Sequence, residues 1–254
     1  MLKREAELYN QKHTEATFGH KVQPYYSLRC IPQILGPIFD EMENAEKVLI
    51  NEVNSACDNP IIDPETENIF HGGHFYGGHI CLAMDTLKNI VANFADRLDR
   101  QLATSVDIKF NRKLPPNLSG SQGEFSLNHG FKAVQIGVSA WTAEALHNTM
   151  PMSVFSRSTE CHNQDKVSMG TIAARDCIRV IELTEQVAAA VLLAASQALR
   201  IRLERGEIFD VRIAGVRATY DQVFEHFAPL ACDRQLEGDL RKTLQLIREK
   251  HYAV

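Results

Sequence analysis

The amino-acid sequence predicts an all-α protein, folded as a bundle of long helices. Its 254 residues include only 14 glycines and 9 prolines, and these helix-breaking residues are clustered. Between the clusters, apolar residues recur at steps of three and four, which is the period of one face of an α-helix. No alternating pattern of useful length indicates a strand, and no internal repeat indicates a solenoid.

Four segments carry the helical period. The first follows Pro32 and ends before Asn54, the second runs from Ile80 to Leu98, and the third covers about 131–148. The fourth runs from Val167 to Leu203 without a proline and consists mainly of strong helix formers. At 1.5 Å per residue it is expected to extend roughly 55 Å.

The fourth segment needs more neighbours than a monomer provides. Its centre, VAAAVLLAAS at 187–196, is apolar nearly all round, so other helices must enclose it. A helix of that length cannot bury its surface on a compact chain of this size. We therefore expect the core to continue into partner subunits of a homo-oligomer.

Gly206 is the expected C-terminal stop of this long helix, because glycine accepts the left-handed backbone that ends many helices. Beyond it, residues 220–227 and 236–247 have the pattern of shorter amphipathic helices. The sequence is therefore divided into a central helical bundle, residues 1–206, and a peripheral C-terminal helical tail, residues 207–254.

Charge and composition exclude several classes of protein. Lys and Arg number 27 against 32 Asp and Glu, a net charge of -5, with no basic cluster to neutralise the phosphates of a nucleic acid. The longest apolar stretch, 187–195, is shorter than the roughly 20 residues that span a bilayer, and the first residues lack the apolar core of a secretory signal. The six cysteines form no CxxC pair, as expected of reduced thiols in a cytoplasmic protein.

Polar segments between the helices carry the groups that can do chemistry. In the first, QPYYSLR at 23–29, Tyr26 and Arg29 are three residues apart and share one face of a helical turn. A guanidinium beside a phenol suits a substrate carboxylate, which arginine binds through two parallel hydrogen bonds. A surface turn capped by Ser27 is the alternative. In the second, NEVNSACDNP at 51–60, Asp-Asn-Pro is expected to end a helix and start a turn.

The third polar segment, HGGHFYGGH at 71–79, places three histidines around two glycine pairs. A metal site is one interpretation, but the spacing fits no strong ligand pattern, and no cysteine or carboxylate is near enough in sequence to complete four ligands. A loop whose glycines let the backbone approach a ligand, with Phe75 as an apolar wall, is favoured.

The fourth polar segment, STECHNQDK at 158–166, precedes the longest helix. Its Ser, Asn and Asp could cap that helix, or the free N–H groups at the helix start could attract an anion, and the sequence does not choose between them. The segment LSGSQG at 118–123 matches no phosphate-loop or nucleophile-elbow pattern and is expected to be a flexible loop.

Taken in order, these segments resemble one family, the aromatic amino acid ammonia-lyases, which includes the histidine, phenylalanine and tyrosine ammonia-lyases and the related aminomutases. The matching signatures are VQPYYSLRC at 22–30, NEVNSACDNPII at 51–62, HGGHFYG at 71–77 and HNQDKVSMG at 162–170. The resemblance covers essentially the whole chain but only the C-terminal half of the family's protein. It implies the helical fold of that half, a homotetramer and an aromatic L-amino acid as substrate.

The resemblance also implies a prosthetic group, 4-methylidene-imidazol-5-one (MIO), which the family forms from an Ala-Ser-Gly tripeptide in its N-terminal half. This chain contains no Ala-Ser-Gly, and its Ser119-Gly120 lies in the wrong place to be the precursor. The tyrosine with which the family removes the β-proton belongs to the same missing half. The chain is therefore expected to be inactive alone, as a fragment, a truncated product or one half of a split enzyme whose N-terminal half is separate.

Residue by residue, the resemblance assigns roles within the substrate pocket. Arg29 would hold the substrate carboxylate, with Tyr26 beside it. Gln23 and Asn59 match residues that hydrogen-bond around the MIO group and orient it. Phe75 matches the aromatic wall next to that group.

Glu160 and Gln164 match positions that line the pocket near the substrate amine and ring. Their spacing of four residues predicts that they lie on one face of a helical turn. Gln164 stands where histidine ammonia-lyases usually carry Glu, and Lys166 stands where they typically carry His, whereas His-Asn-Gln is typical of plant-type phenylalanine and tyrosine lyases. His74 departs from the family's usual Asn. These differences favour phenylalanine or tyrosine over histidine as substrate.

Three hypotheses follow. The first is an enzyme or enzyme half that deaminates an aromatic L-amino acid to an arylacrylate and ammonia, and an aminomutase would share the same residues. The second is a catalytically inactive helical assembly or regulatory subunit that lacks the MIO-forming half. The third is a metal hydrolase built on His71, His74 and His79.

Overall fold

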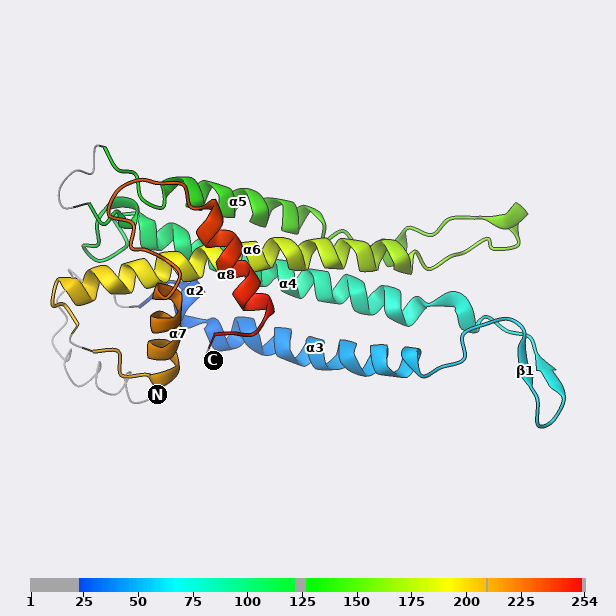
Figure 1. Ribbon diagram of the computed structural model, residues 1–254. Helices are drawn as coiled ribbons and strands as arrows, with labels where there is room; N and C mark the ends of the chain where they lie inside the picture. The colour runs from blue at the N-terminus through cyan, green and yellow to red at the C-terminus, as the bar shows by residue number, and fades with distance from the viewer. Residues whose placement is uncertain (1–22, 122–126, 209, 253–254) are drawn as a thin grey trace.

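The computed structural model describes residues 23–121, 127–208 and 210–252, which form an elongated bundle of long helices (Figure 1). The helices are α2 (Tyr26–Arg29), α3 (Ile31–Val53), α4 (Gly78–Val106), α5 (Lys132–His147), α6 (Gly170–Glu204), α7 (Ala214–Phe224) and α8 (Glu237–Arg248). Between them lie the 3-10 turns η1 (His74–Tyr76), η2 (Pro116–Leu118), η3 (Met152–Val154) and η4 (Glu160–His162), and a hairpin of β1 (Ile61–Asp63) and β2 (Asn68–Phe70). The prediction of an all-α fold is confirmed.

Parts of three sequence interpretations lie outside the described residues. The first is the N-terminal stretch, in which no signal pattern was found. The second is Val22 of the first signature, and the third is Gln122–Gly123 of the LSGSQG segment.

The four long helices occur where the helical period predicts them. α6 begins at Gly170 rather than Val167, because Met169 has a left-handed φ of 62° that a helix cannot contain. The stop at Gly206 is confirmed: its φ is 65°, its N–H donates to the Leu203 carbonyl at 3.0 Å, and the Glu207 N–H donates to the Arg202 carbonyl at 3.0 Å. This pair of bonds satisfies two carbonyls that the helix end leaves free.

Two sequence expectations about smaller elements are wrong. α7 begins at Ala214 and ends at Phe224, whereas the apolar period predicts residues 220–227. Its first turn is solvent-facing, so the pattern of buried side chains gives no sign of it. The hairpin was not expected either, because its strands have three residues each and the side chains of Ile62 and Ile69 are exposed, which leaves no buried face to produce an alternating pattern.

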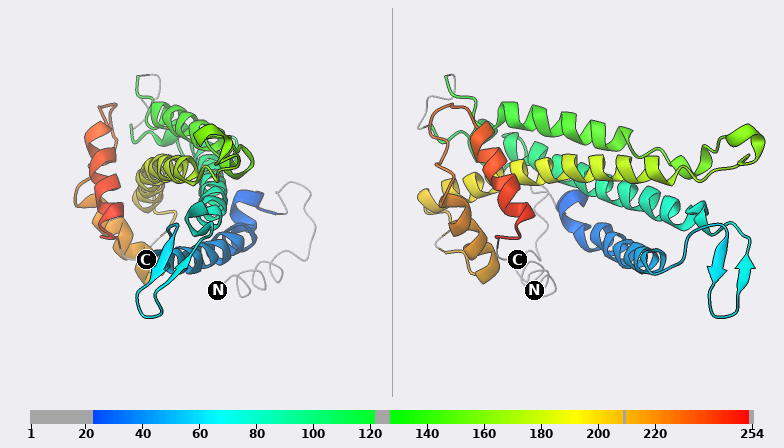
Figure 2. Two further views of the ribbon diagram at one scale, coloured as in Figure 1. Left: turned by 90° about the vertical axis from the view of Figure 1, so that its right-hand side faces the viewer. Right: turned by 45° about the vertical axis from the view of Figure 1, so that its right-hand side comes forward.

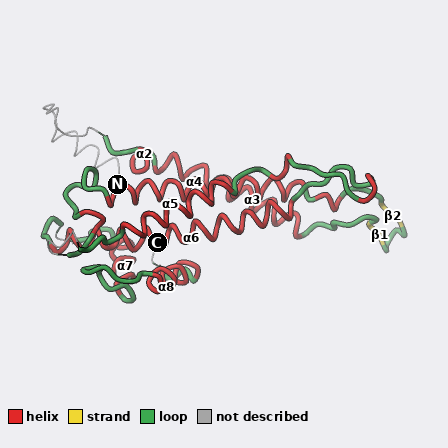
Figure 3. Tube along the Cα trace, turned by 90° about the horizontal axis from the view of Figure 1, so that it is seen from above, coloured by secondary structure: helices red, strands yellow, loops and turns green. Residues whose placement is uncertain are grey.

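α4 is the central helix of the bundle and contacts α3, α5 and α6. The view along the bundle shows these helices side by side, with α7 and α8 packed beside α6 (Figure 2). The tail therefore flanks α6 toward one end of the bundle. At the opposite end, the hairpin and the segment between α5 and α6 extend beyond the helices (Figure 3).

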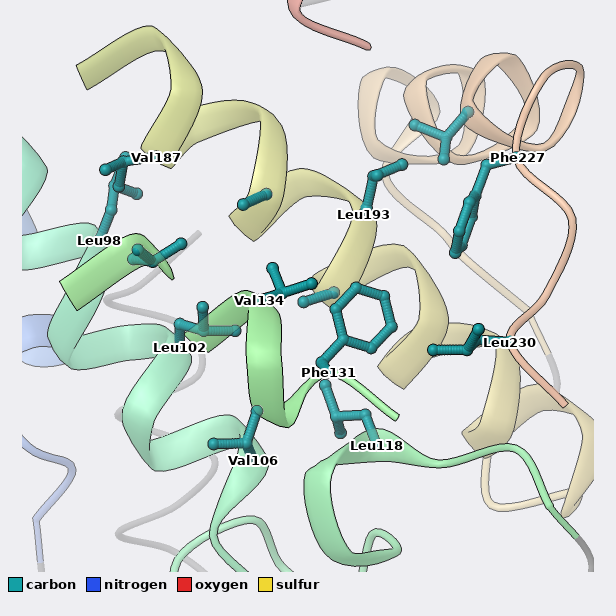
Figure 4. Close-up of a cluster of buried hydrophobic side chains, with 14 of the residues drawn as sticks. Leu98, Leu102, Val106, Leu118, Phe131, Val134, Val187, Leu193, Phe227 and Leu230 are labelled. Atoms are coloured by element: carbon teal, nitrogen blue, oxygen red, sulfur yellow. The ribbon is translucent and has the colours of Figure 1, made fainter. Parts of the chain in front are cut away.

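The main core lies at the end of the bundle that the tail covers (Figure 4). Its side chains come from α4, η2, the start of α5, α6 and the tail: Leu98, Leu102, Val106, Leu118, Phe131, Val134, Val187, Leu193, Phe227 and Leu230. Gln197 of α6 is buried among them and joins the tail to the bundle, because its amide accepts from the Leu230 N–H at 3.1 Å and donates to the Leu118 carbonyl at 3.3 Å. No described helix is long and apolar enough to cross a membrane.

Leu193→Ala tests this core. Leu193 is fully buried between the bundle and the tail, so the substitution is expected to lower the free energy of unfolding by about 2–5 kcal/mol, through lost burial and the cavity that remains. Urea unfolding measures the change. Leu127→Ala, at an exposed leucine in the loop before α5, is the control and should change it by less than about 0.5 kcal/mol. Equal effects of the two substitutions would contradict this description of the core.

Candidate active site

The predicted site residues fall into two groups that α3 holds apart (Figure 1). Gln23, Tyr26 and Arg29 precede α3, whereas Asn59, Phe75, Glu160 and Gln164 lie at the other end of the bundle. A straight helix of 23 residues is about 34 Å long at 1.5 Å per residue. A single chain therefore does not bring the seven residues together in one pocket.

The first group lies on α2, and the predicted juxtaposition of Tyr26 and Arg29 is confirmed. The Arg29 guanidinium carbon is 4.4 Å from the centre of the Tyr26 ring. Tyr26 is 69% exposed and Arg29 is exposed too, so the pair faces outward as a cation against an aromatic face. Ser27 does not cap this turn: its carbonyl accepts a hydrogen bond of 2.7 Å from the Gln101 side chain, which fastens α2 to α4.

Asn59 lies in the connection from α3 to the hairpin. Its side-chain oxygen accepts the N–H of Gly72 at 3.0 Å, so it joins the two sides of the hairpin's base. The expectation that Asp-Asn-Pro ends α3 is wrong, because the helix ends at Val53 and Asn54 caps it, with the side-chain amide of Asn54 donating to the Ile50 carbonyl at 2.7 Å.

Phe75 lies in η1, just before α4, and is 52% exposed. Gly77 separates the two elements with a φ of 66°, which a glycine adopts without steric cost. That the glycines let the backbone approach a ligand, with Phe75 as an apolar wall, stays a prediction; the structure shows the turn and the exposed ring. Among the described residues, no group of three or more His, Cys, Asp or Glu side chains is arranged to hold a metal ion, so the three histidines do not converge.

Glu160 and Gln164 lie on the segment 155–169 between η3 and α6, which we call the arm. The spacing of four residues predicts that Glu160 and Gln164 share one face of a helical turn, and this prediction is wrong. The backbone of Glu160, Cys161 and His162 is left-handed, with φ of 49°, 52° and 68°. Gln164 instead pairs with Thr159 in an isolated antiparallel bridge, in which the Thr159 N–H donates to the Gln164 carbonyl at 2.8 Å.

The left-handed turn of the arm is costly, at about 1–2 kcal/mol for each residue with a side chain. Such strain persists where the surrounding structure enforces it, and it is concentrated at functional sites. Polar contacts brace the turn: the Asn163 amide donates to the Glu160 carboxylate at 3.1 Å, and Ser158 Oγ hydrogen-bonds His162 Nδ1 at 2.7 Å. Residues 157–166 of the arm are exposed, so the shape of the turn depends on these bonds rather than on apolar packing.

Capping of the long helix by the polar residues of the arm is also contradicted. Met169 is the N-cap residue of α6 and no side chain caps it in the usual way. Instead the first turn of α6 abuts the start of α4, where Cys81 Sγ donates to the Ser168 carbonyl at 2.9 Å. The starts of α4 and α6 are thus joined, which brings the Phe75 turn and the arm to the same end of the bundle.

The residues of one chain fit the MIO group in type but not in arrangement. Side-chain amides and an exposed aromatic ring suit a flat ring with carbonyl acceptors. However, Gln23 is separated from Asn59 and Phe75 by the length of α3. The chain also lacks the Ala-Ser-Gly tripeptide. These residues therefore form no complete cradle for that group within a single copy.

Asp85 and Lys88 of α4 form a buried charge pair at this end of the bundle, which the helical period did not single out. The two residues are three apart on an otherwise apolar face, beside Met84 and Leu87. Charged residues on the apolar face of a helix are the signal that could have identified them, because buried charges are rare unless they are paired.

Comparisons with known proteins identify the family of this chain. The family model of aromatic amino acid lyases matches residues 4–224. The chain is 37% identical over 229 residues to a histidine ammonia-lyase of Natranaerobius thermophilus, covering 90% of this chain and 44% of that protein. It is 40% identical over 219 residues to a tyrosine ammonia-lyase of Cereibacter sphaeroides, covering 86% of this chain and 41% of that protein.

Solved structures give the same assignment. The phenylalanine aminomutase of Pantoea agglomerans superimposes with a TM-score of 0.83 at 32% identity, over 96% of this chain and 47% of that one. The tyrosine aminomutase of Streptomyces globisporus gives a TM-score of 0.85 at 31% identity, over 97% and 46%. The chain thus spans less than half the length of these relatives. By sequence and by fold, it belongs to the aromatic amino acid lyase family.

Proposed function

We propose that this chain is the C-terminal portion of an ammonia-lyase that converts L-phenylalanine or L-tyrosine, or alternatively L-histidine, to an arylacrylate and ammonia without oxidation. The exposed pair of Tyr26 and Arg29 carries the proposal, because it presents a cation and a phenol at the position of a family signature. The named relatives act on histidine and on tyrosine. They therefore support the class of reaction and do not select a particular substrate. We further propose residues 1–206 as the catalytic bundle, 207–254 as a peripheral tail, and the cytoplasm as its location.

The reaction requires two things that ordinary side chains supply poorly. The β-proton of an amino acid is weakly acidic, and ammonia is a poor leaving group. In the family the MIO group supplies the electrophile that captures the amine. In this proposal Arg29 binds and orients the carboxylate and does no acid–base work, since a guanidinium stays protonated. Glu160 and Gln164 line the pocket near the amine and the ring.

Asn59 and Gln23 complete the proposed pocket as amide donors that orient the prosthetic group, with Phe75 as its aromatic wall. Asn59 already uses its oxygen to hold the hairpin base, which leaves its NH2 group as the donor. The group itself has no precursor in this sequence. We therefore propose that a second polypeptide segment supplies both MIO and the base.

A site shared among several copies, in a homotetramer, is the second part of the proposal. The length of α3 separates the two groups of site residues by far more than the size of one amino acid, so a complete pocket needs more than one copy. Within α3 only Ala45 is buried, whereas Phe39, Ile50 and Val53 are exposed, Val53 by 82%. Apolar side chains gathered on a helix face in this way mark an interface.

Two other functions retain support from particular observations. An aminomutase is favoured by the two solved structures, which are aminomutases at 31–32% identity. It would use the same residues and return the amine to the neighbouring carbon. An inactive assembly subunit is supported by the exposed apolar side chains of α3, which suit association with other copies. Product analysis distinguishes an aminomutase from a lyase. Complementation distinguishes an inactive assembly subunit from either enzyme.

Self-association is the first expected outcome. The full chain should sediment as an oligomer at roughly micromolar concentration, because the exposed face of α3 is otherwise left in water. Ile50→Asp places a charge on that face and should shift the chain toward monomer. Leu127→Asp, at an exposed leucine outside the helices, should leave the distribution unchanged. A stable, folded wild-type monomer would contradict the shared site.

The second outcome concerns activity. The purified chain alone should produce no arylacrylate absorbance with phenylalanine, tyrosine or histidine. Co-expression with an N-terminal half that carries Ala-Ser-Gly, such as that of the tyrosine ammonia-lyase relative, should restore turnover. Turnover by the chain alone would refute the need for a complementing segment. A soluble complex with no turnover would instead favour the inactive assembly subunit.

The third outcome tests Arg29 in that complemented enzyme. Arg29→Lys should lower kcat/KM by about 30- to 1000-fold, or about 2–4 kcal/mol, since lysine keeps the charge but loses the planar two-point contact with a carboxylate. Arg29→Ala should lower it further and weaken binding of the arylacrylate product. Arg241→Lys, on the exposed face of α8, is the matched control and should remain within twofold. If Arg29→Ala keeps near-normal kcat/KM with unchanged circular dichroism, Arg29 does not bind the carboxylate.

A further inference from the structure

Asp85 and Lys88 lie deep in the bundle, on the stripe of α4 that faces the arm. Cys81, Asp85 and Lys88 are spaced by four and three residues, so they follow one another along a single face of the helix. Lys88 has no exposed surface and Asp85 is 3% exposed. Their charged atoms are 2.9 Å apart, and the Asp176 carboxylate of α6 lies 3.6 Å from the ammonium.

The remaining bonds of this pair go to the backbone at the start of the arm. Lys88 Nζ donates to the Met150 carbonyl at 2.7 Å. The Asp85 carboxylate accepts the N–H of Met152 at 3.0 Å and the N–H of Ser153 at 2.9 Å. Three hydrogen bonds, to the backbone of Met150, Met152 and Ser153, therefore fix the segment from which the arm emerges.

The other end of the arm is held by the same helix. Cys81 Sγ donates to the Ser168 carbonyl at 2.9 Å. Between the two ends, the Val167 N–H donates to Ser156 Oγ at 2.9 Å and closes the base of the arm. The stripe of α4 thus holds both ends of a segment whose middle, residues 157–166, is exposed.

The electrostatics of Asp85 agree with a charged acceptor. Burial raises the pKa of its carboxyl, but the Lys88 ammonium and the N–H groups of Ser153 and Met152 outweigh burial and bring the pKa below its ordinary value. Asp85 is therefore ionised at neutral pH, and its bonds to the arm are charge-assisted and strong.

A buried ion pair is a poor device for stability alone, because the cost of removing two charges from water cancels most of their attraction. We propose that Asp85 and Lys88 are positioning residues, which anchor residues 150–153 so that the arm holds Glu160 and Gln164 in place at the site. The purpose of the anchoring rests on the proposed function, whereas the anchoring itself does not. Each can therefore fail separately.

Limited proteolysis of the full chain with trypsin tests the anchoring. The arm carries exposed cleavage positions at Arg157 and Lys166, and Lys132 at the start of α5 provides an exposed reference elsewhere. Lys88→Met should raise the rate of cleavage after Arg157 and Lys166 about tenfold relative to cleavage after Lys132, because the freed backbone lets the arm open locally.

A double variant separates positioning from stability. Asp85→Leu combined with Lys88→Met removes both charges with side chains of similar size, so folding stability should return to near the wild-type value. It restores no bond to residues 150–153, so cleavage of the arm should stay about tenfold fast. Lys47→Met breaks an exposed pair with Glu43, also 2.9 Å apart, and is the matched control that should change nothing.

If the arm of the double variant is cleaved at the wild-type rate, the proposal is overturned and the pair has a role in stability only. In the complemented enzyme the double variant should also lower kcat/KM by about tenfold, in step with arm opening. If complementation gives no turnover at all, the proposed function fails while the proteolysis result still stands. If turnover appears and arm cleavage is unchanged in both variants, the anchoring fails alone.

Discussion

The contact between α4 and α6 organises the bundle, and each helix contributes both small and large side chains to it. Ala92 of α4 lies in one buried cluster with Leu183 of α6, and further along Leu98 of α4 lies in another with Ala190 of α6. Small side chains at such a contact let two helices approach closely and pack densely. Both helices begin at the same end of the bundle (Figure 1), so the segments that precede them emerge together there. The positions of Phe75 and of the arm depend on this contact.

The same rigidity that organises one end of the molecule keeps other residues away from it. α3 is continuous from Ile31 to Val53 despite Pro37 within it, so Arg29 and Asn59 stay a helix length apart. Helices of this length do not fold back on themselves to close a pocket. In the assembly that we propose, the length of α3 requires a site shared between copies, and its exposed apolar face lies between those copies.

The arm, which we propose as a segment of the site, is built without a core beneath it. Its left-handed turn costs free energy, and its exposed side chains recover little of that cost by burial. Polar bonds at its two ends, to Asp85, Lys88 and Cys81, replace apolar packing. A segment held in this way keeps its backbone shape while its side chains remain available to a ligand.

The sequence by itself determined the long helices, the stop at Gly206 and the pairing of Tyr26 with Arg29, because each depends on residues within a few positions of one another. Its four signatures also indicated the family. The tertiary structure alone decided that α7 begins at Ala214 and that Gln164 pairs with Thr159 rather than sharing a helical face with Glu160. It also decided that Asp85 and Lys88 are buried against a backbone more than sixty residues away. Contacts with a distant segment bury Asp85 and Lys88, whereas the start of α7 faces solvent and the bridge of Thr159 with Gln164 depends on a left-handed turn, so a local pattern of apolar and polar residues carries no record of these features.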